Sequence, residues 1–165
     1  MVIEPLGKHH DRGAFACGQP ALDDWFRQRA SQDEKRNVAR VFVALDEQFG
    51  VVGFYSLSSF TLSITDLPAE ISRKLPRYEA IPAALIGRLA RDERVKGKGL
   101  GEFLLADAIQ RVLAASRSLA VFAIVVDAKD DRAADFYRGF GFRPFPLSSR
   151  RLFLLADTAA AALKK

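Results

Sequence analysis

Residues 92–113 read DERVKGKGLGEFLLADAIQRVL, and the stretch changes character near its middle. Its first half places Gly97, Gly99 and Gly101 among basic residues. In its second half, apolar residues recur with the i, i+3, i+4, i+7 spacing of an amphipathic helix, at Leu105, Ala108, Ile109 and Val112. The sequence therefore predicts a flexible, positively charged turn that leads directly into a helix.

The start of such a helix is a suitable place to bind a phosphate group. Backbone N–H groups at a helix N-terminus have no partner within the helix, and the helix dipole adds partial positive charge there. Glycines let successive amides turn inward and let a phosphate approach the backbone closely. With Lys96 and Lys98 beside the glycines, the turn indicates a pyrophosphate cradle.

Three alternatives compete with this interpretation. A Walker P-loop needs Gly-Lys-Ser/Thr at the helix start, but Gly101 is followed by Glu102 and Phe103. A dinucleotide-binding turn needs G-x-G-x-x-G after the first strand of a doubly wound sheet, whereas this chain has G-x-G-x-G beyond its midpoint. The third alternative is a flexible loop whose lysines are incidental, and the turn alone leaves it open.

The flanking patterns predict a mixed α/β sheet. Residues 39–46 and 51–59 are β-rich and joined by a short turn with Gly50, as in a hairpin, and a third strand is expected through 60–65. Residues 84–92 read as a strand that enters the glycine turn. The almost wholly apolar residues 119–128 suit a central strand covered on both faces. Further patterns predict helix starts at Pro20 and at Asp130 or Asp131, a loop with a short helix at 67–82, and a last strand at 150–156.

The composition is that of one globular domain. The 165 residues are 49% hydrophobic and 27% charged, and we expect a single domain over residues 1–165. No apolar run approaches the roughly 20 residues needed to cross a bilayer, and no secretion signal is visible, so we expect a cytoplasmic protein. The single cysteine, Cys17, excludes an internal disulfide and a multi-cysteine metal site, and we expect no metal.

The net charge of +5 is concentrated in one stretch. Residues 73–98 contain eight basic and three acidic residues, which gives this stretch alone a net charge of +5. Such a cluster favours a polyanionic partner, either a phosphorylated cofactor or a nucleic acid. A solvated basic face explains the composition equally well.

Two segments together resemble the GCN5-related N-acetyltransferase (GNAT) family. KGKGLG (96–101) resembles the acyl-CoA motif Arg/Gln-x-x-Gly-x-Gly/Ala, with Lys96 in the first position, and a second register that begins at Arg94 also fits. DAKDDRAADFYRGFGFRP (127–144) resembles the Ala-x-x-Phe-Tyr-x-x-x-Gly-Phe segment that follows the fifth strand in this family. The resemblance implies the GNAT fold, a central, mostly antiparallel sheet with splayed fourth and fifth strands, flanked by helices.

The same resemblance implies roles for individual residues. Tyr137 would be the catalytic general acid that protonates the departing thiolate of coenzyme A, although its spacing beside Phe136 and Phe140 suits core packing as well. Main-chain atoms of Leu89 and Arg91 would pair with the pantetheine arm of acetyl-CoA, and Phe136 would pack near its end. The cofactor-binding set is therefore Leu89, Arg91, Lys96, Gly97, Lys98, Gly99, Leu100, Gly101 and Phe136.

Further segments narrow the resemblance to the GNAT toxins of bacterial toxin–antitoxin pairs: FACGQPALDDWFRQRASQD (15–33), GFYSLSS (53–59), LPRYEAIPAALIGRLARD (75–92) and VVDAKD (125–130). The resemblance implies transfer of acetyl from acetyl-CoA to the α-amino group of aminoacyl-tRNA, which blocks translation. It also implies a ribbon-helix-helix antitoxin, operator DNA bound only through the antitoxin complex, and no membrane partner, and it allows a homodimer. Candidate tRNA-binding residues are Arg77, Arg88 and Arg94. Arg91 and Lys96 depart from the usual residues of these toxins.

Two other functions compete with this interpretation: a GNAT that acetylates a small amine or a protein amine, and a catalytically silent GNAT-fold regulatory module. The basic excess near the glycine turn favours tRNA over a small amine, and Tyr137 argues against a silent module. Asp127, Glu93 and water are alternative acceptors for the proton of the attacking amine. His9 and His10 lie in a segment expected to be tail-like, and we expect neither to act in catalysis.

Overall fold

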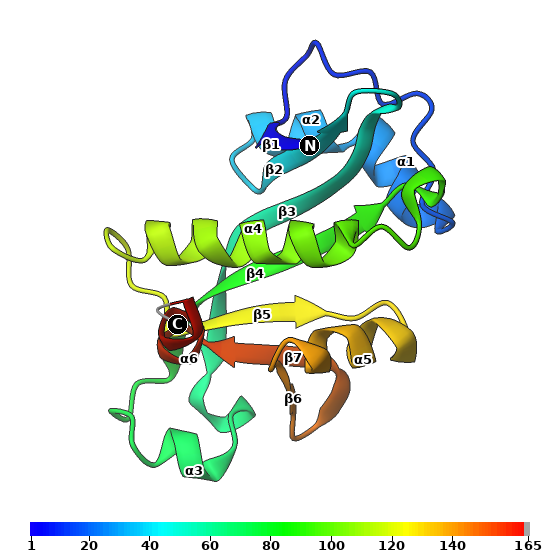
Figure 1. Cartoon of the computed structure of the whole chain (residues 1–165). Coiled ribbons are helices and arrows are strands. Elements are labelled where there is room, and N and C mark those ends of the chain that lie inside the picture. The colour runs from blue at the N-terminus through cyan, green and yellow to red at the C-terminus, as the bar shows by residue number, and fades with distance from the viewer. Residues whose placement is uncertain (164–165) are drawn as a thin grey trace. The chain divides into compact units, whose positions relative to one another are not determined.

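The computed structural model describes residues 1–163 and forms a seven-stranded sheet in the order β1-β2-β3-β4-β5-β7-β6 (Figure 1). Strands β4 and β5 are parallel, whereas β1–β2, β2–β3, β5–β7 and β6–β7 are antiparallel. The predicted mixed, mostly antiparallel α/β sheet is confirmed. Within residues 1–163, no helix combines the length and the apolar character needed to cross a bilayer.

The elements follow one another along the chain as β1 (Val2–Pro5), α1 (Pro20–Gln28), α2 (Ala30–Lys35), β2 (Arg40–Asp46), β3 (Gly50–Ser63), the 3₁₀ helix η1 (Ile64–Asp66), α3 (Ala69–Ser72), β4 (Ala80–Arg91), the 3₁₀ helix η2 (Glu93–Val95), α4 (Leu100–Ala115), β5 (Ala123–Asp127), α5 (Asp131–Gly139), β6 (Arg143–Phe145), β7 (Ser148–Leu155) and α6 (Ala156–Leu163).

The contacts divide the chain into two compact units. The first contains Met1–Ser58 and Gly87–Gln110, and the second contains Ser59–Ile86 and the chain from Arg111 on. Strands β3 and β4 and helix α4 contribute residues to both units. The single domain over residues 1–165 therefore stays a prediction, and each unit is described by itself.

The core of the first unit is aromatic. Helix α1 begins at Pro20, as predicted, because the fixed φ of proline suits the first helical position and its missing N–H is not needed there. Phe26 of this helix stacks on Phe54 of β3, with ring centroids 4.1 Å apart and an angle of 5° between the ring planes. Phe15 packs edge-on against both rings, with centroids 5.0 and 5.5 Å away. All three side chains are buried, so this cluster fixes α1 on the sheet.

The predicted hairpin is formed by β2 and β3. Asp46 ends β2 and pairs with Gly50, which begins β3 with a φ of +73°. The Asp46 carboxylate accepts hydrogen bonds from the N–H groups of Gln48 and Phe49, at 2.9 and 3.0 Å. These backbone hydrogen bonds hold the pKa of Asp46 below its ordinary value. The turn therefore depends on a glycine with positive φ and on an acceptor side chain.

The core of the second unit lies on one face of β4, β5 and β7. Ala83 of β4 pairs with Ala123 of β5, and Val125 of β5 pairs with Phe153 of β7. Because successive residues of a strand point to opposite faces, these side chains share a face, where Phe145 of β6 joins them. The central strand β5 is buried from Ala123 to Val126, as its apolar sequence predicts.

Several details of the sequence-based outline were wrong. Residues 60–65 do not form a separate strand, because β3 runs without a break for 14 residues to Ser63. The strand expected over 119–128 is limited to Ala123–Asp127, and Leu119 is exposed. Strands β1 and β6 were not anticipated, because each is short and its register comes from a neighbouring strand rather than from its own pattern.

Candidate functional site

The glycine turn is held in place by a buried carboxylate. Asp92 follows β4 and is only 1% exposed. Its carboxylate accepts hydrogen bonds from the N–H, Nε and Nη2 of Arg94 at 2.8 to 2.9 Å, and from the N–H of Ala16 at 3.2 Å. The Glu93 N–H donates in turn to the Ala16 carbonyl at 2.9 Å. The start of the turn is thus tied to a loop 76 residues earlier in the chain.

Two glycines then give the turn its course. Gly97 and Gly99 have φ values of +80° and +77°, a region that side chains with a Cβ rarely adopt. No atom lies within 4 Å of a Cβ built at Gly97, so glycine is needed there for its backbone conformation rather than for lack of space. Lys96, Gly97, Lys98 and Gly99 are all exposed. The turn therefore presents its backbone and its two lysines to solvent.

Helix α4 begins immediately after the turn, at Leu100, and runs for 16 residues. Leu100 and Leu104 face Gly53 of β3, where a built Cβ would lie 3.3 and 3.0 Å from their methyl carbons. Gly53 therefore permits the close approach of the helix to the strand. The Tyr55 hydroxyl donates a hydrogen bond of 2.5 Å to Asp107, further along the same helix. The N-terminal end of α4 is thereby fixed on β3.

The strand that leads to the turn carries the next two predicted residues. Leu89 and Arg91 of β4 are half-buried. Arg88 directly precedes Leu89, and its guanidinium lies 4.1 Å from the ring centroid of Trp25. The backbone N–H of Arg88 donates to Ser56 Oγ at 3.1 Å. Burial lowers the pKa of Arg88, partly offset by the charge of Asp33. The stacking on Trp25 therefore gives Arg88 a fixed orientation.

The three arginines predicted to bind tRNA lie in different settings. Arg77 is exposed in the segment between α3 and β4. Arg88 stacks on Trp25, and Arg94 is bound to Asp92 with its guanidinium 5.1 Å from the Phe49 ring centroid. Two of the three are thus engaged within the first unit, while Arg77 belongs to the second.

Tyr137 lies on α5, in the second unit. Asp130 caps this helix by accepting a hydrogen bond from the Ala133 N–H at 2.8 Å, which decides between the two predicted caps. Tyr137 is 6% exposed and packs against Phe136 and Phe142, with ring centroids 5.3 and 5.7 Å away. Burial, with the added charge of Asp127, raises the pKa of Tyr137 to about 12. The phenol is therefore neutral, and able to donate a proton, throughout the physiological range.

Phe136 precedes Tyr137 and is half-buried. Its ring also lies 5.3 Å from that of Phe140, which is exposed. The structure thus groups the predicted residues in two sets. The first unit holds Leu89, Arg91 and the turn from Lys96 to Gly101, and the second unit holds Phe136 and Tyr137.

The N-terminal histidines are not in a tail. His10 is buried, its Nδ1 accepts a hydrogen bond from the Gly7 N–H at 2.8 Å, and its Nε2 lies 2.6 Å from Glu4 Oε1. Because Nδ1 is an acceptor, the neutral ring carries its proton on Nε2 and donates it to Glu4. Glu4, His9 and His10 have ligand atoms within 4.8 Å of one another, and the Nε2 hydrogen bond of His10 lies inside this group. The cluster therefore fixes the segment after β1.

A comparison with protein families shows to which family this chain belongs. The model of the acetyltransferase (GNAT) family matches residues 9–142. The chain belongs to the GNAT family. The match covers α1 to α5, and so includes the glycine turn, helix α4 and Tyr137.

Individual GNAT relatives are similar over nearly the whole chain. A protein of Sinorhizobium fredii (strain NBRC 101917 / NGR234) named "Probable toxin TacT" is 36% identical over 162 residues, which is 93% of this chain and 90% of the relative. A "tRNA-acetylating toxin" of Mycobacterium tuberculosis (strain ATCC 25618 / H37Rv) is 38% identical over 153 residues, with the same shares covered. Both are therefore similar in length as well as in sequence.

Solved structures show the same fold. A tyrosine-to-phenylalanine mutant of KacT superimposes with a TM-score of 0.91 at 26% identity, over 98% of each chain. AtaT complexed with acetyl-methionyl-tRNAfMet superimposes with a TM-score of 0.89 at 26% identity, again over 98% of each chain. AtaTR bound with AcCoA gives a TM-score of 0.85 at 26% identity, over 98% of this chain and 97% of the other.

Two residues that hold the site were missed from the sequence. Asp92 was counted only as an acidic residue, yet it ties the glycine turn to Ala16. Gly53 was seen only as part of a β-rich run, yet it lets α4 pack on β3. A signal was present for Asp92, because aspartate directly before a short helix is a preferred N-cap residue. No local signal marks Gly53, since its role depends on a helix about 50 residues away.

Proposed function

We propose that this protein is the toxin of a type II toxin–antitoxin pair and transfers acetyl from acetyl-CoA to the α-amino group of aminoacyl-tRNA. The observation that carries the proposal is the similarity to a tRNA-acetylating toxin, at 38% identity over 93% of this chain. The structural likeness to AtaT with acetyl-methionyl-tRNAfMet supports the same acceptor class. The GNAT family membership supports the reaction type.

The glycine turn suits the pyrophosphate of acetyl-CoA. Its backbone is exposed, its two glycines hold φ values that leave the approach free of side chains, and α4 follows directly with its dipole. In this proposal Lys96 and Lys98 add positive charge, while amides from Gly97 to Gly101 donate to phosphate oxygens. Main-chain atoms of Leu89 and Arg91 bind the pantetheine arm, and Phe136 packs near its end.

Tyr137 acts on the leaving group. The amine nitrogen attacks the thioester carbonyl, the new C–N bond forms, the C–S bond breaks, and the sulfur receives the phenolic proton. A thiol has a pKa near 8.5, so complete transfer from a phenol of pKa about 12 is uphill by about 5 kcal/mol. Tyr137 therefore acts chiefly by donating a hydrogen bond while negative charge develops on sulfur, and solvent then restores any proton that it gives up.

The attacking amine needs little help from the protein. The α-amino group has an ordinary pKa near 8, so a substantial neutral fraction exists at pH 7 to 8. Water is then sufficient to take the proton that the nitrogen loses on attack. Asp127 and Glu93 are alternative proton acceptors, but the reaction does not require either. Direct transfer in a ternary complex follows, since no step needs a covalent acyl-enzyme.

The remaining partners follow from the same proposal. A ribbon-helix-helix antitoxin neutralises the protein, and operator DNA is bound only through that complex. Arg77, Arg88 and Arg94 are the proposed tRNA contacts, with Arg88 and Arg94 restricted by the contacts that they already make. We propose a cytoplasmic protein without a metal cofactor.

The test is acetyl-CoA-dependent arrest of translation. In a reconstituted translation reaction, the purified protein is expected to stop synthesis only when acetyl-CoA is present, and labelled acetyl is expected on charged tRNA but not on uncharged tRNA. Tyr137→Phe is the matched variant, because it removes the phenolic proton and keeps the ring that packs on Phe136 and Phe142. Arrest that does not require acetyl-CoA would contradict the proposal.

A further inference from the structure

The aromatic core of the first unit ends in an arginine. Phe26 stacks on Phe54, and Phe54 stacks on Trp25 with ring centroids 5.8 Å apart and 28° between the ring planes. The guanidinium carbon of Arg88 lies over the Trp25 ring, 4.1 Å from its centroid, which is close to van der Waals contact. Trp25 is 6% exposed, whereas Arg88 is half-buried. Arg88 is therefore the most exposed member of this series of stacked groups.

Arg88 lies on the face of the strands that α1 covers. Ala90 packs in the same buried cluster as Trp25 and Phe54. Because residues two apart in a strand point to the same face, Arg88 shares this face with Ala90. Helix α4 packs on the other face, where Leu100 and Leu104 approach Gly53. The Arg88 side chain and the helix that follows the glycine turn are therefore on opposite faces.

The guanidinium of Arg88 has no acceptor within the protein. It forms no hydrogen bond and no ion pair with any of residues 1–163, and only the backbone N–H of Arg88 donates, to Ser56 Oγ. Other arginines that lie over aromatic rings, at 5.1 to 5.6 Å, have guanidinium groups bound to side chains: Arg12 to Ser31, Arg94 to Asp92 and Arg143 to Glu70. Arg88 is thus fixed by its ring contact alone, which leaves its N–H groups available to a ligand.

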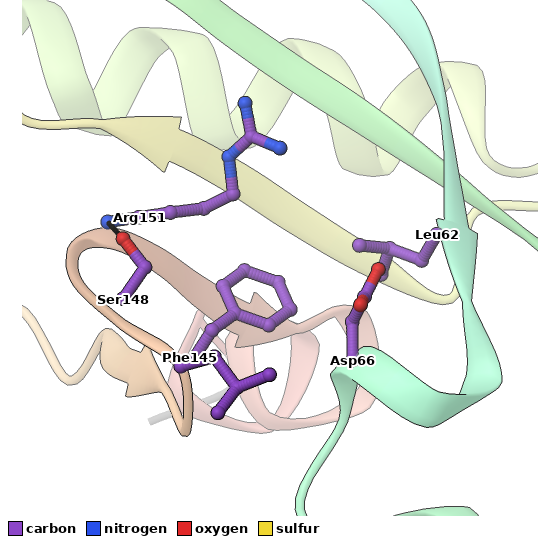
Figure 2. A pocket seen from close by; sticks show the side chains of 6 residues that line it. Leu62, Asp66, Phe145, Ser148 and Arg151 are labelled. Carbon is purple, nitrogen blue, oxygen red and sulfur yellow. Dashed lines mark hydrogen bonds between the residues drawn. The ribbon is translucent and has the colours of Figure 1, made fainter.

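The arginine of the second unit's cavity shows the same contrast. Figure 2 shows Arg151 in the lining of this cavity, together with Leu62 and Phe145. Arg151 lies 5.1 Å from the ring centroid of Phe60, but its Nε and Nη2 donate to the two carboxylate oxygens of Asp127 at 2.8 and 3.0 Å. Arg151 is therefore already paired within the protein, whereas Arg88 is not.

The charges around Arg88 favour a planar ligand over a phosphate. Asp33 Oδ2 accepts a hydrogen bond from Trp25 Nε1 at 2.9 Å, and the charge of Asp33 acts on Arg88. Arg88 and Asp33 together have no net charge, so their attraction for a phosphate is weak. Stacking does not depend on net charge, and unpaired nucleobases stack on guanidinium planes as they do on aromatic rings. The expected ligand is therefore a nucleobase.

A nucleobase could come from the acceptor RNA or from the adenine of acetyl-CoA. In the proposed function the turn at 96–101 binds the pyrophosphate, and main-chain atoms of Leu89 and Arg91 bind the pantetheine arm. The pyrophosphate separates the pantetheine arm from the adenosine, so the adenine lies beyond the turn and away from Arg88. The acceptor RNA is therefore the favoured source.

We propose that Arg88, held over Trp25, is a stacking platform for one unpaired nucleobase at the 3′ end of the acceptor tRNA, an inference that rests on the proposed function above. The base lies on the side of the guanidinium that Trp25 does not cover, so Arg88 keeps its ring contact when tRNA binds. Because every base has a π-face, the platform helps to hold the 3′ end without selecting among acceptors.

The test measures how far affinity depends on a single base. The probe is a labelled RNA hairpin of an acceptor stem whose 3′ end carries, through a stable amide bond, the amino acid whose tRNA the protein acetylates best. Each unpaired position of this 3′ end is made abasic in turn, and Kd is measured without acetyl-CoA. We expect one abasic position to raise the wild-type Kd at least fivefold, since stacking of a base contributes about 5- to 150-fold.

The wild-type protein also reports where the base binds. Trp25 is the only tryptophan of the chain, and it lies directly beneath the Arg88 guanidinium. We expect the intact hairpin to change the emission of Trp25, and the hairpin with the decisive abasic position to leave that emission unchanged. An equal change with both hairpins would place the base elsewhere.

Two variants separate the plane of Arg88 from its charge. Arg88→Lys keeps the charge and removes the plane, and Arg88→Met keeps an apolar stem over Trp25 and removes both. For each variant we expect a Kd for the intact hairpin at least fivefold above wild type. The abasic hairpin should then raise Kd less than twofold further, because both changes remove the same contact. Arg88→Met should change the slope of log K against log salt by less than about 0.3, whereas loss of a phosphate contact would make it less steep by about 0.7.

The matched control is Arg40→Lys, which makes the same change at an exposed arginine of the first unit that is bound to Glu34. It should keep the wild-type dependence on the base. KM for acetyl-CoA should stay within twofold in all three variants, and a rise confined to the Arg88 variants, with hairpin binding unchanged, would assign the stacked base to the cofactor instead.

The outcomes distinguish this inference from the proposed function. If the wild-type protein acetylates no charged tRNA, both fail. If it does so, but no abasic position raises Kd twofold or Arg88→Lys keeps the wild-type dependence on the base, the function stands and Arg88 is not the platform. If Arg88→Lys binds as tightly as wild type while Arg88→Met makes the salt slope less steep by about 0.7, Arg88 contacts a phosphate and the inference is wrong.

Discussion

Replacing Asp92 with asparagine is expected to weaken acetyl-CoA binding while leaving the catalytic acid intact. The Asp92 carboxylate accepts four hydrogen bonds, three from Arg94 and one from the Ala16 N–H. An asparagine has one acceptor oxygen, and its NH₂ group takes the place of the second carboxylate oxygen. That NH₂ group is a donor and would face two other donors. At least two hydrogen bonds are therefore lost in a site that is 1% exposed.

The size of the effect follows from those contacts. A hydrogen bond to a charged group contributes about 1.5–3 kcal/mol, and the lower end applies because the Arg94 side chain is 33% exposed. We therefore expect the loss of two such bonds to weaken the anchoring of the glycine turn by about 3 kcal/mol. If the ordered turn is the form that binds the pyrophosphate, KM for acetyl-CoA rises at least tenfold, since 1.4 kcal/mol corresponds to a factor of ten.

The assay is steady-state acetylation of a charged tRNA at varied acetyl-CoA, with thermal unfolding of the same preparations. We expect kcat to change less than threefold, because Tyr137 lies in the other unit. Glu34→Gln is the matched control. Glu34 likewise binds an arginine (Arg40, 2.9 Å) and a backbone N–H (Val41, 2.7 Å), but it lies apart from the turn in the sequence and in its contacts. A folded Asp92→Asn protein with a wild-type KM for acetyl-CoA would refute the reasoning.

Three further predictions test the site. Tyr137→Phe is expected to lower kcat about 100-fold with KM for acetyl-CoA little changed, because one hydrogen-bond donor to a developing negative charge contributes about 10²- to 10³-fold. An undiminished kcat would contradict the assignment. The pKa of Tyr137 is raised from 10 to about 12, so its stabilising effect is complete below pH 10 and is lost as pH rises to 12. The free energy of unfolding should therefore fall by about 2 kcal/mol between pH 9 and pH 12, and the Tyr137→Phe variant should lack this fall. Gly99→Ala strains a residue with φ +77° by about 1–2 kcal/mol and should raise KM for acetyl-CoA, whereas Gly50→Ala, with φ +73° in the β2–β3 hairpin, should destabilise equally without changing that KM.

The features predicted correctly from the sequence are those that depend on neighbours in the chain. The turn from Lys96 to Gly99 is local, since positive φ at glycine and the following helix start are both properties of adjacent residues. The hairpin at Gly50 and the helix start at Pro20 are local in the same way. Each of these features has a pattern with a single physical explanation, so the sequence is sufficient to predict it.

The features that the sequence did not show depend on distant partners. The tie from Asp92 to Ala16 spans 76 residues, and the contact of Gly53 with Leu104 spans two elements. His10 was assigned to a tail because its pairing with Glu4 requires β1, a strand too short to recognise from its own residues. For Tyr137 the spacing matched both core packing and catalysis, and the structure shows why: the burial that packs the ring also raises its pKa.

The same distinction applies to the basic stretch from Arg73 to Lys98. Its net charge of +5 suggested a tRNA-binding surface, but charge in the sequence does not distinguish a free cation from one already bound. Arg94 is neutralised by Asp92, and Arg88 is held on Trp25. If Lys96 and Lys98 serve the pyrophosphate, and if the proposed contacts Arg88 and Arg94 keep their internal partners, the cations of this stretch that remain for tRNA are those of Lys74, Arg77 and Arg91. Arg73 donates to a carbonyl of α3. Three phosphate contacts predict a slope of log K against log salt of about −2 to −3. Arg77→Ala should make this slope less steep by about one without changing KM for acetyl-CoA. A slope of about −4 would show instead that Arg88 and Arg94 leave their internal partners when tRNA binds, since five contacts would then be made.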